Sequence, residues 1–340
     1  MLFNRAPNFF ADDSPLNGHM QFRRVPCAWR DRSSSKIRDE VIDEELLVKI
    51  ISIGEVLWDV VGLEQHLGGA PFNFAAHLGK LGHTIFFISA VGADQRGEQI
   101  LESMSQMGLS TRYMRRVEEH PTGIATVTLD AQGQPQFLIH RPAAYDFPDL
   151  TESDLDELLS QPTDWIYFGT LLQMSSHARR LTMRLLDSNN AARRFYDVNL
   201  RASSYETSLV RELMSRATVV KMNDHEVSEV AQMFGQPTDS LEDFCRSYAN
   251  TFGWEGVCVT RGPQGCVLLI GDEYIEANGY AVEAVDTVGA GDAFAAAFVH
   301  GFGSGWSAPE IADFANRVGA LVASRRGATP AWTIEGARAL

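Results

Sequence analysis

Beyond residue 47 the apolar residues of the chain fall into two alternating patterns. Short continuous apolar runs, typical of buried strands, alternate with stretches whose apolar positions recur every three or four residues, typical of amphipathic helices. The expected strands are residues 47–53, 84–91, 165–168, 194–198, 218–222, 256–260 and 266–270. The expected helices are residues 70–81, 96–107, 175–188, 208–216, 225–234, 241–252, 290–303 and 308–324.

This alternation predicts an α/β fold. Strands that alternate with helices form a mostly parallel sheet covered on both faces, and right-handed crossovers then give a doubly wound α/β/α sandwich. Two segments break the alternation. Residues 55–67 follow the first strand without a helix, and residues 123–140 carry two β runs around Gln132-Gly133-Gln134, which is a hairpin signal. We expect these two segments to form a small separate sheet.

The first 48 residues differ from the rest of the chain. They contain three prolines, a run of three serines and no clear apolar period, so we interpret them as a poorly ordered extension. They lack the apolar core of a signal peptide; a true start near Met20 and an interaction arm are the alternatives. The main domain is expected at residues 49–332, with the small sheet drawn from about 55–67 and 121–145, and a C-terminal tail at 333–340.

The composition of the chain mainly excludes classes of partner and of protein. The chain has 340 residues, 45% of them hydrophobic, and a formal net charge of −15. No basic run suggests nucleic acid or an anionic membrane as a partner, and no apolar run approaches the ~20 residues of a membrane span. The cysteines Cys27, Cys245, Cys258 and Cys266 form no C-x-x-C pair. This usage fits a reducing compartment, so we expect a cytoplasmic protein.

The most informative stretch is residues 286–294, which read Asp-Thr-Val-Gly-Ala-Gly-Asp-Ala-Phe and lead into an apolar helix. Glycines and small residues leave free backbone N–H groups in the first turn of that helix, which makes a ready anion site. Asp292 lies inside this site, where a carboxylate is unfavourable unless it has a task such as accepting a proton. Phosphoryl transfer needs both groups, a set of donors and a base. The alternative is a Gly-rich turn with a capping Asp.

This stretch resembles the C-terminal signature of the ribokinase/pfkB family of carbohydrate kinases. Two further motifs support the resemblance. Residues 68–73, Gly-Gly-Ala-Pro-Phe-Asn, resemble the family's N-terminal signature, and residues 54–59, Gly-Glu-Val-Leu-Trp-Asp, look closest to fructokinase-like members. The resemblance covers residues 48–332. It implies a ribokinase-like fold in which the small sheet is a lid over the active cleft.

The resemblance also implies a role for each matching residue. Asp292 would be the base, and the N–H groups of Gly289, Ala290 and Gly291 would stabilise charge on the γ-phosphate of ATP. The residues implied at the sugar are Asp59, Gly68, Gly69, Asn73, Asn199 and Arg201. Taken alone, the glycine pair is only a turn, Asp59 a solvated carboxylate and Arg201 a surface ion pair.

The nucleotide side rests on shorter motifs. Asn223 and Glu226 match the family's Asn-x-x-Glu pattern, whose oxygens suit a hydrated Mg²⁺ that bridges nucleotide phosphates. The same spacing predicts a helix N-cap with a capping box, and both interpretations can hold together. The implied nucleotide contacts are Asn223, Thr260, Gly262, Gly265 and Asn316. Asp286, with the loop 324–329, resembles a monovalent cation site, so K⁺ is a further expected ion.

These residues predict an ATP-dependent kinase that phosphorylates a primary hydroxyl of a neutral sugar, with fructose first. A phosphosugar would need extra cations at the sugar end, where the lid segments offer His140 and Arg141 but no lysine. Nucleoside, sugar-acid and phosphosugar kinases are the alternatives within the family. A non-catalytic sugar or nucleotide sensor is the alternative outside it. A dinucleotide-dependent oxidoreductase is disfavoured because G-x-G-x-x-G is missing. The exposed edge of the lid sheet suggests a homodimer.

Overall fold

The structure is a computed structural model that describes residues 47–129, 135–160, 162–189, 191–201 and 205–340. The predicted extension therefore lies almost entirely outside the described residues, as does the turn at Gln132-Gly133-Gln134. Residues 45–340 form one compact unit, and the description below concerns that unit.

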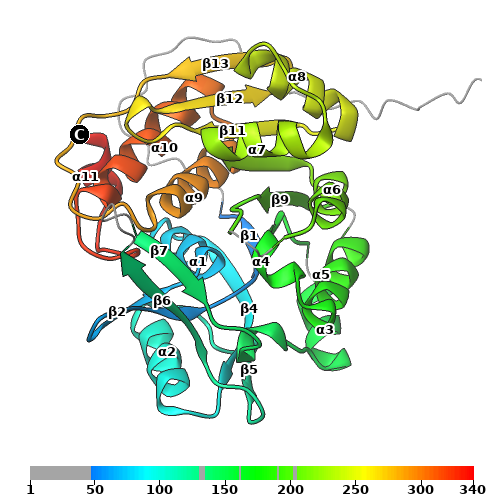
Figure 1. Ribbon diagram of the computed structural model, residues 1–340, viewed down its shortest axis with the longest axis vertical. Helices are drawn as coiled ribbons and strands as arrows, with labels where there is room; N and C mark the ends of the chain where they lie inside the picture. Colours follow the sequence, from blue (N-terminus) through cyan, green and yellow to red (C-terminus); the bar gives the residue numbers. More distant parts are fainter. Residues whose placement is uncertain (1–46, 130–134, 161, 190, 202–204) are drawn as a thin grey trace, which may run out of the picture. The chain divides into compact units, whose positions relative to one another are not determined.

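Nine strands form a large sheet in the order β13-β12-β11-β10-β9-β8-β1-β4-β5 (Figure 1). Strands β5 to β11 of this order run parallel, and β12 runs against both of its neighbours. The bounds are β1 Lys49–Ile53, β4 Thr84–Gly92, β5 Met114–Val117, β8 Trp165–Gly169, β9 Arg193–Asp197, β10 Val219–Asn223, β11 Gly256–Thr260, β12 Cys266–Ile270 and β13 Glu273–Ala277. From β1 the chain continues to β4 on one side and later to β8 on the other. The predicted doubly wound sheet is confirmed.

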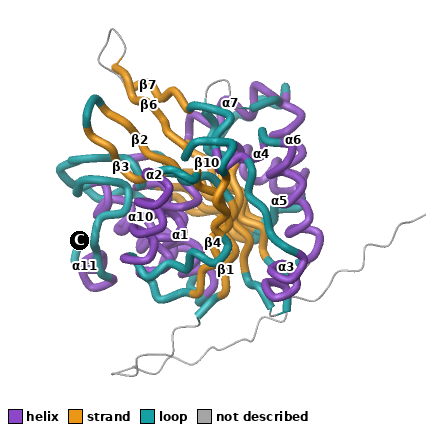
Figure 2. Tube along the Cα trace, turned by 90° about the horizontal axis from the view of Figure 1, so that it is seen from below, coloured by secondary structure: helices purple, strands orange, loops and turns teal. Residues whose placement is uncertain are grey.

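Helices cover both faces of the sheet (Figure 2). One apolar core lies under α1 Ala70–Lys80, α2 Gln95–Gln106, α9 Ala290–Gly303, α10 Ala308–Ala323 and α11 Ile334–Arg338. A second core lies under α3 Glu152–Leu159, α4 Thr170–Gln173, α5 Ser176–Ser188, α6 Thr207–Arg216, α7 Asp224–Phe234 and α8 Leu241–Phe252. No helix among the described residues is long and apolar enough to cross a membrane.

The small sheet also forms as expected. Its strands are β2 Leu57–Val61, β3 Glu64–Gly68, β6 Gly123–Leu129 and β7 Pro135–Ile139, in the order β3-β2-β6-β7. The parallel pairing of β2 with β6 joins two hairpins that are distant in sequence. Because β2 begins a few residues after β1 ends, this sheet starts from the edge of the large sheet at which the parallel strands end.

Every strand and helix expected from the apolar pattern is present, with ends shifted by no more than two residues. The pattern missed β5, β13, α3, α4 and α11, which are short or half exposed and so carry little apolar periodicity. The expected tail at 333–340 contains α11, which Thr333 caps through its side chain. Of the four cysteines, Cys245, Cys258 and Cys266 are described, and all three are buried and unbridged.

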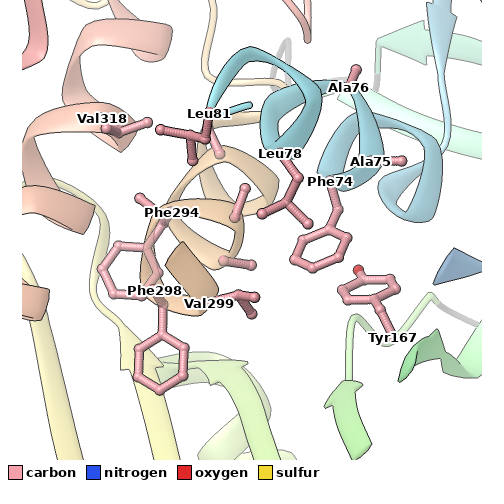
Figure 3. Packing of buried hydrophobic residues seen from close by; sticks show 14 of the residues in the cluster. Phe74, Ala75, Ala76, Leu78, Leu81, Tyr167, Phe294, Phe298, Val299 and Val318 are labelled. Carbon is pink, nitrogen blue, oxygen red and sulfur yellow. The ribbon is translucent and has the colours of Figure 1, made fainter. Parts of the chain in front are cut away.

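The core between α1 and α9 fixes the position of the site described next. Phe74 and Leu78 from α1 and Phe294 and Phe298 from α9 are fully or almost fully buried, and Figure 3 shows them facing a common interior with Tyr167 of β8. Burial of side chains of this size stabilises the fold by about 1.5–3 kcal/mol each. The N-terminal turns of α1 and α9 are therefore held rigidly against each other.

Candidate active site

Polar side chains gather where the parallel strands of the large sheet end. Glu55 follows β1, and Asp197, Asn223 and Thr260 are the last residues of β9, β10 and β11. Because β1 lies where the strand order reverses, this edge is where ligands of open α/β sheets bind. The predicted lid strand β2 continues from the same edge.

Asp292 lies in the first turn of α9 and is 9% exposed. Asn73 Nδ2 donates a hydrogen bond of 2.8 Å to Asp292 Oδ2, across 219 residues of sequence. Asn73 Oδ1 is buried and has no hydrogen-bond partner among the described residues. The two family signatures therefore meet in one contact. The sequence predicted Asn73 only as a sugar contact, and the structure gives it the added task of orienting Asp292.

The electrostatic surroundings of Asp292 make it a weak acid. Burial raises the pKa of Asp292 to about 6, while Lys221 opposes this rise and Asp197 adds to it. The hydrogen bond from Asn73 also favours the charged form. A carboxylate with this pKa is ionised at neutral pH and still basic enough to accept a proton, which suits a general base.

The start of α9 has the geometry of an anion site. Gly289 is the N-cap, with φ of 80°. Ala290 N–H donates to Thr287 O at 3.3 Å, whereas the N–H groups of Gly289 and Gly291 have no acceptor within the described part of the chain. A Cβ on Gly289 would lie 2.3 Å from Ala328 O, so only glycine fits. Free N–H groups at this end of a helix bind negative charge.

Carboxylates dominate the end of the site at which the sugar is predicted to bind. Burial raises the pKa of Asp59 on β2 to about 6, and the nearby Arg201 opposes this rise. Burial likewise raises the pKa of Glu55 to about 7, again against Arg201. Glu55 Oε2 is buried without a hydrogen-bond partner among the residues described. The sequence reasoning missed Glu55, although a carboxylate two residues after an apolar strand indicates the edge of the sheet at which ligands bind.

Glycines of the N-terminal signature allow this crowding. A Cβ on Gly68 would lie 2.3 Å from Asp59 Oδ2, and a Cβ on Gly69, whose φ is 109°, would lie 2.5 Å from Glu55 O. In the loop after β9, Asn199 has a φ of 36°, a left-handed conformation that Asn tolerates better than most residues. Arg201 is exposed, and its charge acts on Glu55, Asp59 and Asp292.

Asn223 and Glu226 form the capping box of α7. Asn223 Oδ1 accepts from Glu226 N at 2.9 Å, and Glu226 Oε2 accepts from Asn223 N at 2.8 Å. Glu226 Oε1 accepts from Leu200 N at 2.8 Å. With both oxygens engaged and the side chain buried, Glu226 suits contact with a hydrated ion and not direct ligation. Within the described residues no three His, Cys, Asp or Glu side chains are grouped to hold a metal. The Mg²⁺ role stays a prediction.

The remaining predicted nucleotide residues hold loops. Thr260 ends β11, and Gly262 and Gly265 shape the turn to β12 with φ of 55° and 90°. Asn316 on α10 is buried and its Nδ2 donates to Asn278 O at 3.2 Å. These residues therefore shape or hold loops of the protein. The nucleotide contacts themselves stay predictions.

Asp286 ties its own loop to the loop 324–329. Asp286 Oδ1 accepts from Val288 N and Oδ2 accepts from Gly327 N, each at 3.0 Å. The predicted proximity of the two loops is therefore observed. The K⁺ ion expected between them stays a prediction.

A buried ion pair completes the site, and the sequence reasoning gave it no role. Lys221 Nζ lies 3.1 Å from both oxygens of Asp197. The signal was available, because a lysine interrupts an otherwise apolar run two residues before the Asn-x-x-Glu motif.

Comparison with known proteins agrees with this geometry. The sequence matches the pfkB family carbohydrate kinase profile over residues 37–334. A protein of Pyrococcus horikoshii named as a sugar kinase is 30% identical over 294 residues, which cover 84% of this chain and 89% of that protein. The fructokinase of Escherichia coli is 28% identical over 278 residues, which cover 78% and 88% of the two chains.

Solved structures share the fold. The structure of the Pyrococcus horikoshii protein in complex with ATP has a TM-score of 0.73 at 28% identity, covering 85% of this chain and 99% of that one. The fructokinase of Xylella fastidiosa with bound ATP has a TM-score of 0.77 at 22% identity, covering 86% and 97%. The profile match over most of the chain shows that this protein belongs to the pfkB family of carbohydrate kinases.

Proposed function

We propose that this kinase transfers the γ-phosphate of ATP to a primary hydroxyl of a neutral sugar, with fructose as the first candidate. The observation that carries the proposal is the hydrogen bond between Asn73 and Asp292 at the N-terminus of α9. This bond holds the carboxylate that would accept the proton in place at the anion site, and relatives of this chain are named as fructokinases or sugar kinases.

In the proposed reaction Asp292 accepts the proton of the attacking sugar hydroxyl. The sugar oxygen forms a bond to the γ-phosphorus, the bond from that phosphorus to the bridging oxygen of ADP breaks, and ADP leaves. Backbone N–H groups at Gly289 and Gly291 stabilise charge on the transferring group. Mg²⁺ bound to ATP would neutralise phosphate charge, with Asn223 and Glu226 near its water shell.

Charge at the sugar end supports a neutral acceptor. Glu55, Asp59 and Asp292 bring three carboxylates there, and Arg201 is the exposed cation that acts on all three. Lys221 also acts on Asp292, but it is paired with Asp197. The other basic groups predicted near this end have partners. Arg141 bonds to Asp146 and donates to Leu171 O at 2.8 Å, and His140 Nε2 lies 2.7 Å from Thr126 Oγ1.

A phosphosugar or a sugar acid would place its own negative charge beside these carboxylates, at a cost in binding free energy. A hydroxyl-rich neutral sugar instead supplies donors that carboxylates accept. Unpartnered oxygens on Glu55 and Asn73 offer two such acceptors. A nucleoside is the remaining neutral alternative within the family.

The test is ADP release from ATP and Mg²⁺ across fructose, ribose, other neutral sugars, a ketodeoxy sugar acid, a sugar phosphate and adenosine, each with and without K⁺. We expect turnover with a neutral sugar, fructose foremost. Turnover with the sugar acid or the sugar phosphate alone would overturn the neutral-sugar assignment, and turnover with adenosine alone would replace the sugar with a nucleoside.

A further inference from the structure

A single buried cation lies among the buried carboxylates of the active site. Lys221 is the only lysine or arginine with less than 9% exposure among the residues that the structure describes. Asp197, Glu226, Asp292 and Glu55 are buried at the same edge of the sheet. Buried charges of one sign are strongly unfavourable unless a partner compensates them.

Lys221 is held at a defined place. It pairs in register with Asp197 on the neighbouring strand, and its Nζ donates to both carboxylate oxygens of Asp197 at 3.1 Å. Burial alone would lower the pKa of Lys221, but Asp197, with Asp292 and Glu226, raises it above its ordinary value. Lys221 therefore remains an ammonium group throughout the physiological range of pH.

This ammonium lies directly against the first turn of α9. A Cβ on Gly291 would be 3.3 Å from Lys221 Nζ. Glycine at position 291 thus leaves room for the cation immediately beside Asp292. No other lysine or arginine among the described residues is buried, so Lys221 is the one buried cation that acts on Asp292.

The ion pair is anchored to the helix that orients Asp292. Tyr167 Oη donates to Asp197 Oδ2 at 3.0 Å. The ring of Tyr167 stacks on Phe74, with centroids 4.0 Å apart and an angle of 19° between the planes (Figure 3). Phe74 follows Asn73, whose side chain holds Asp292. One set of contacts therefore fixes Lys221, Asp197 and Asp292 together.

All charged and titratable neighbours of Asp292 enter the balance. Lys221 on β10, Asp197 on β9, Asn73 on α1 and Arg201 after β9 act on Asp292 directly. Asp292 in turn acts on Glu55 after β1, Asp59 on β2 and Tyr167 on β8. Among these groups Lys221 is the strongest that favours the ionised form of Asp292.

We propose that Lys221, held by Asp197, is a positioning residue that keeps Asp292 in the carboxylate form needed to accept the sugar proton. The inference rests on the proposed role of Asp292 as the base. By keeping Asp292 ionised, Lys221 would set the lowest pH at which the enzyme turns over.

The test is kcat against pH at saturating ATP, Mg²⁺ and sugar. Saturation matters because Asp59 and Glu55 also titrate between about pH 6 and 7, and groups that act on sugar binding affect KM and not kcat. In wild type the rate falls below about pH 6, because Asp292 becomes protonated. In Lys221→Met we expect this limb to move upward by about one pH unit.

Two controls separate charge from structure. Lys221→Arg keeps the positive charge and should keep the wild-type limb. Lys49→Met removes an ammonium group from β1 at the opposite edge of the sheet, where it donates to Leu158 O, and should also leave the limb in place. Because Lys221→Met leaves Asp197 buried and unpaired, it can prevent folding. The double variant Lys221→Met/Asp197→Asn removes both charges and should show a smaller upward shift.

If kcat of Lys221→Met falls at the same acidic pH as kcat of wild type, the inference is overturned. If Lys221→Met does not fold, the same result in the double variant overturns it. An equal shift in Lys221→Arg overturns it too. Asp292→Asn distinguishes the two levels of the account. If Asp292→Asn keeps its turnover, the proposed role of Asp292 as the base fails, and the present inference fails with it. If Asp292→Asn is inactive and Lys221→Met is unshifted, only the present inference fails.

Discussion

Gly289 shows how one residue can serve both stability and chemistry. Its φ of 80° favours glycine, and its missing Cβ leaves room for Ala328 O. The sequence indicated that a glycine was needed at the start of this helix. It could not indicate the neighbour, because Ala328 approaches only once α9 and the loop 324–329 are packed together.

We expect Gly289→Ala to lower the free energy of unfolding by about 1–3 kcal/mol and turnover by at least about tenfold, since one anion-binding N–H moves. Urea unfolding and kcat measure the two effects. Gly235→Ala is the matched control. Gly235 also has positive φ, of 64°, but nothing lies within 4 Å of its missing Cβ, so that variant should lose some stability and keep its kcat. Wild-type turnover in Gly289→Ala would contradict the anion-site role.

The sequence predicted only part of the role of Asn73 and no role for Lys221. Motif position indicated that Asn73 belongs to the site, but its hydrogen bond to Asp292 depends on how α1 and α9 pack. Lys221 was passed over because strand residues were taken as core. The contact of Asn73 with Asp292, across 219 residues of sequence, follows from packing, which local sequence patterns do not encode.

At the scale of elements, two tasks are predicted for the first turn of helix α7. The sequence predicted a capping box and an Mg²⁺ contact at Asn223 and Glu226, which can hold together; the structure confirms the capping box, and the Mg²⁺ contact stays a prediction. We expect Asn223→Ala to cost about 1 kcal/mol of unfolding free energy and also to raise KM for ATP. The control is Thr151→Ala, which removes the similar capping box of α3.

Thr151→Ala should lower stability by a similar amount without affecting KM. If Asn223→Ala also leaves KM unchanged, then Asn223 only caps the helix and the predicted Mg²⁺ contact is wrong.

The small sheet has exposed apolar side chains, and a role as a lid does not by itself explain them. Leu63, in the turn between β2 and β3, is 102% exposed, and Leu138 on β7 is 61% exposed. An open sheet edge with apolar residues favours pairing with another copy, so the homodimer stays our prediction. Light scattering at micromolar concentration should give a dimer for wild type and a monomer for Leu63→Asp.

Leu47→Asp is the control for that experiment. Leu47 is 64% exposed but lies two residues before β1, away from the small sheet, so its replacement should leave the dimer intact. A wild-type monomer at all concentrations would contradict the prediction.

Elements themselves were the most predictable level of this protein. Strands such as β1 and β11 are mostly apolar and have four of their five residues buried. Helices such as α5 show clear amphipathic spacing, so both kinds of element are visible in sequence. The two halves of the small sheet were visible as interruptions of that alternation. Elements such as β13 and α3 were not, because partly exposed or short segments lack a strong apolar pattern.

At the scale of the whole molecule, the fold brings together groups that the chain keeps far apart. Asp59 and Asn73 come from the first third of the domain, Asp197 and Lys221 from the middle, and Asp292 from the end. The parallel sheet achieves this because all its strands end at one edge. The fold class could therefore be predicted from sequence, as could the edge of the sheet at which the candidate site residues gather. The electrostatic interactions among these residues required the three-dimensional arrangement.

The most direct test of the central claim is ADP formation by Asp292→Asn with saturating ATP, Mg²⁺ and the sugar found to be the best substrate. The substitution keeps the shape of the side chain and removes its basicity. We predict a loss of about 10²–10⁴-fold in kcat, with a sugar dissociation constant, measured by calorimetry, that stays close to wild type. Turnover near the wild-type rate would contradict the claim that Asp292 is the base.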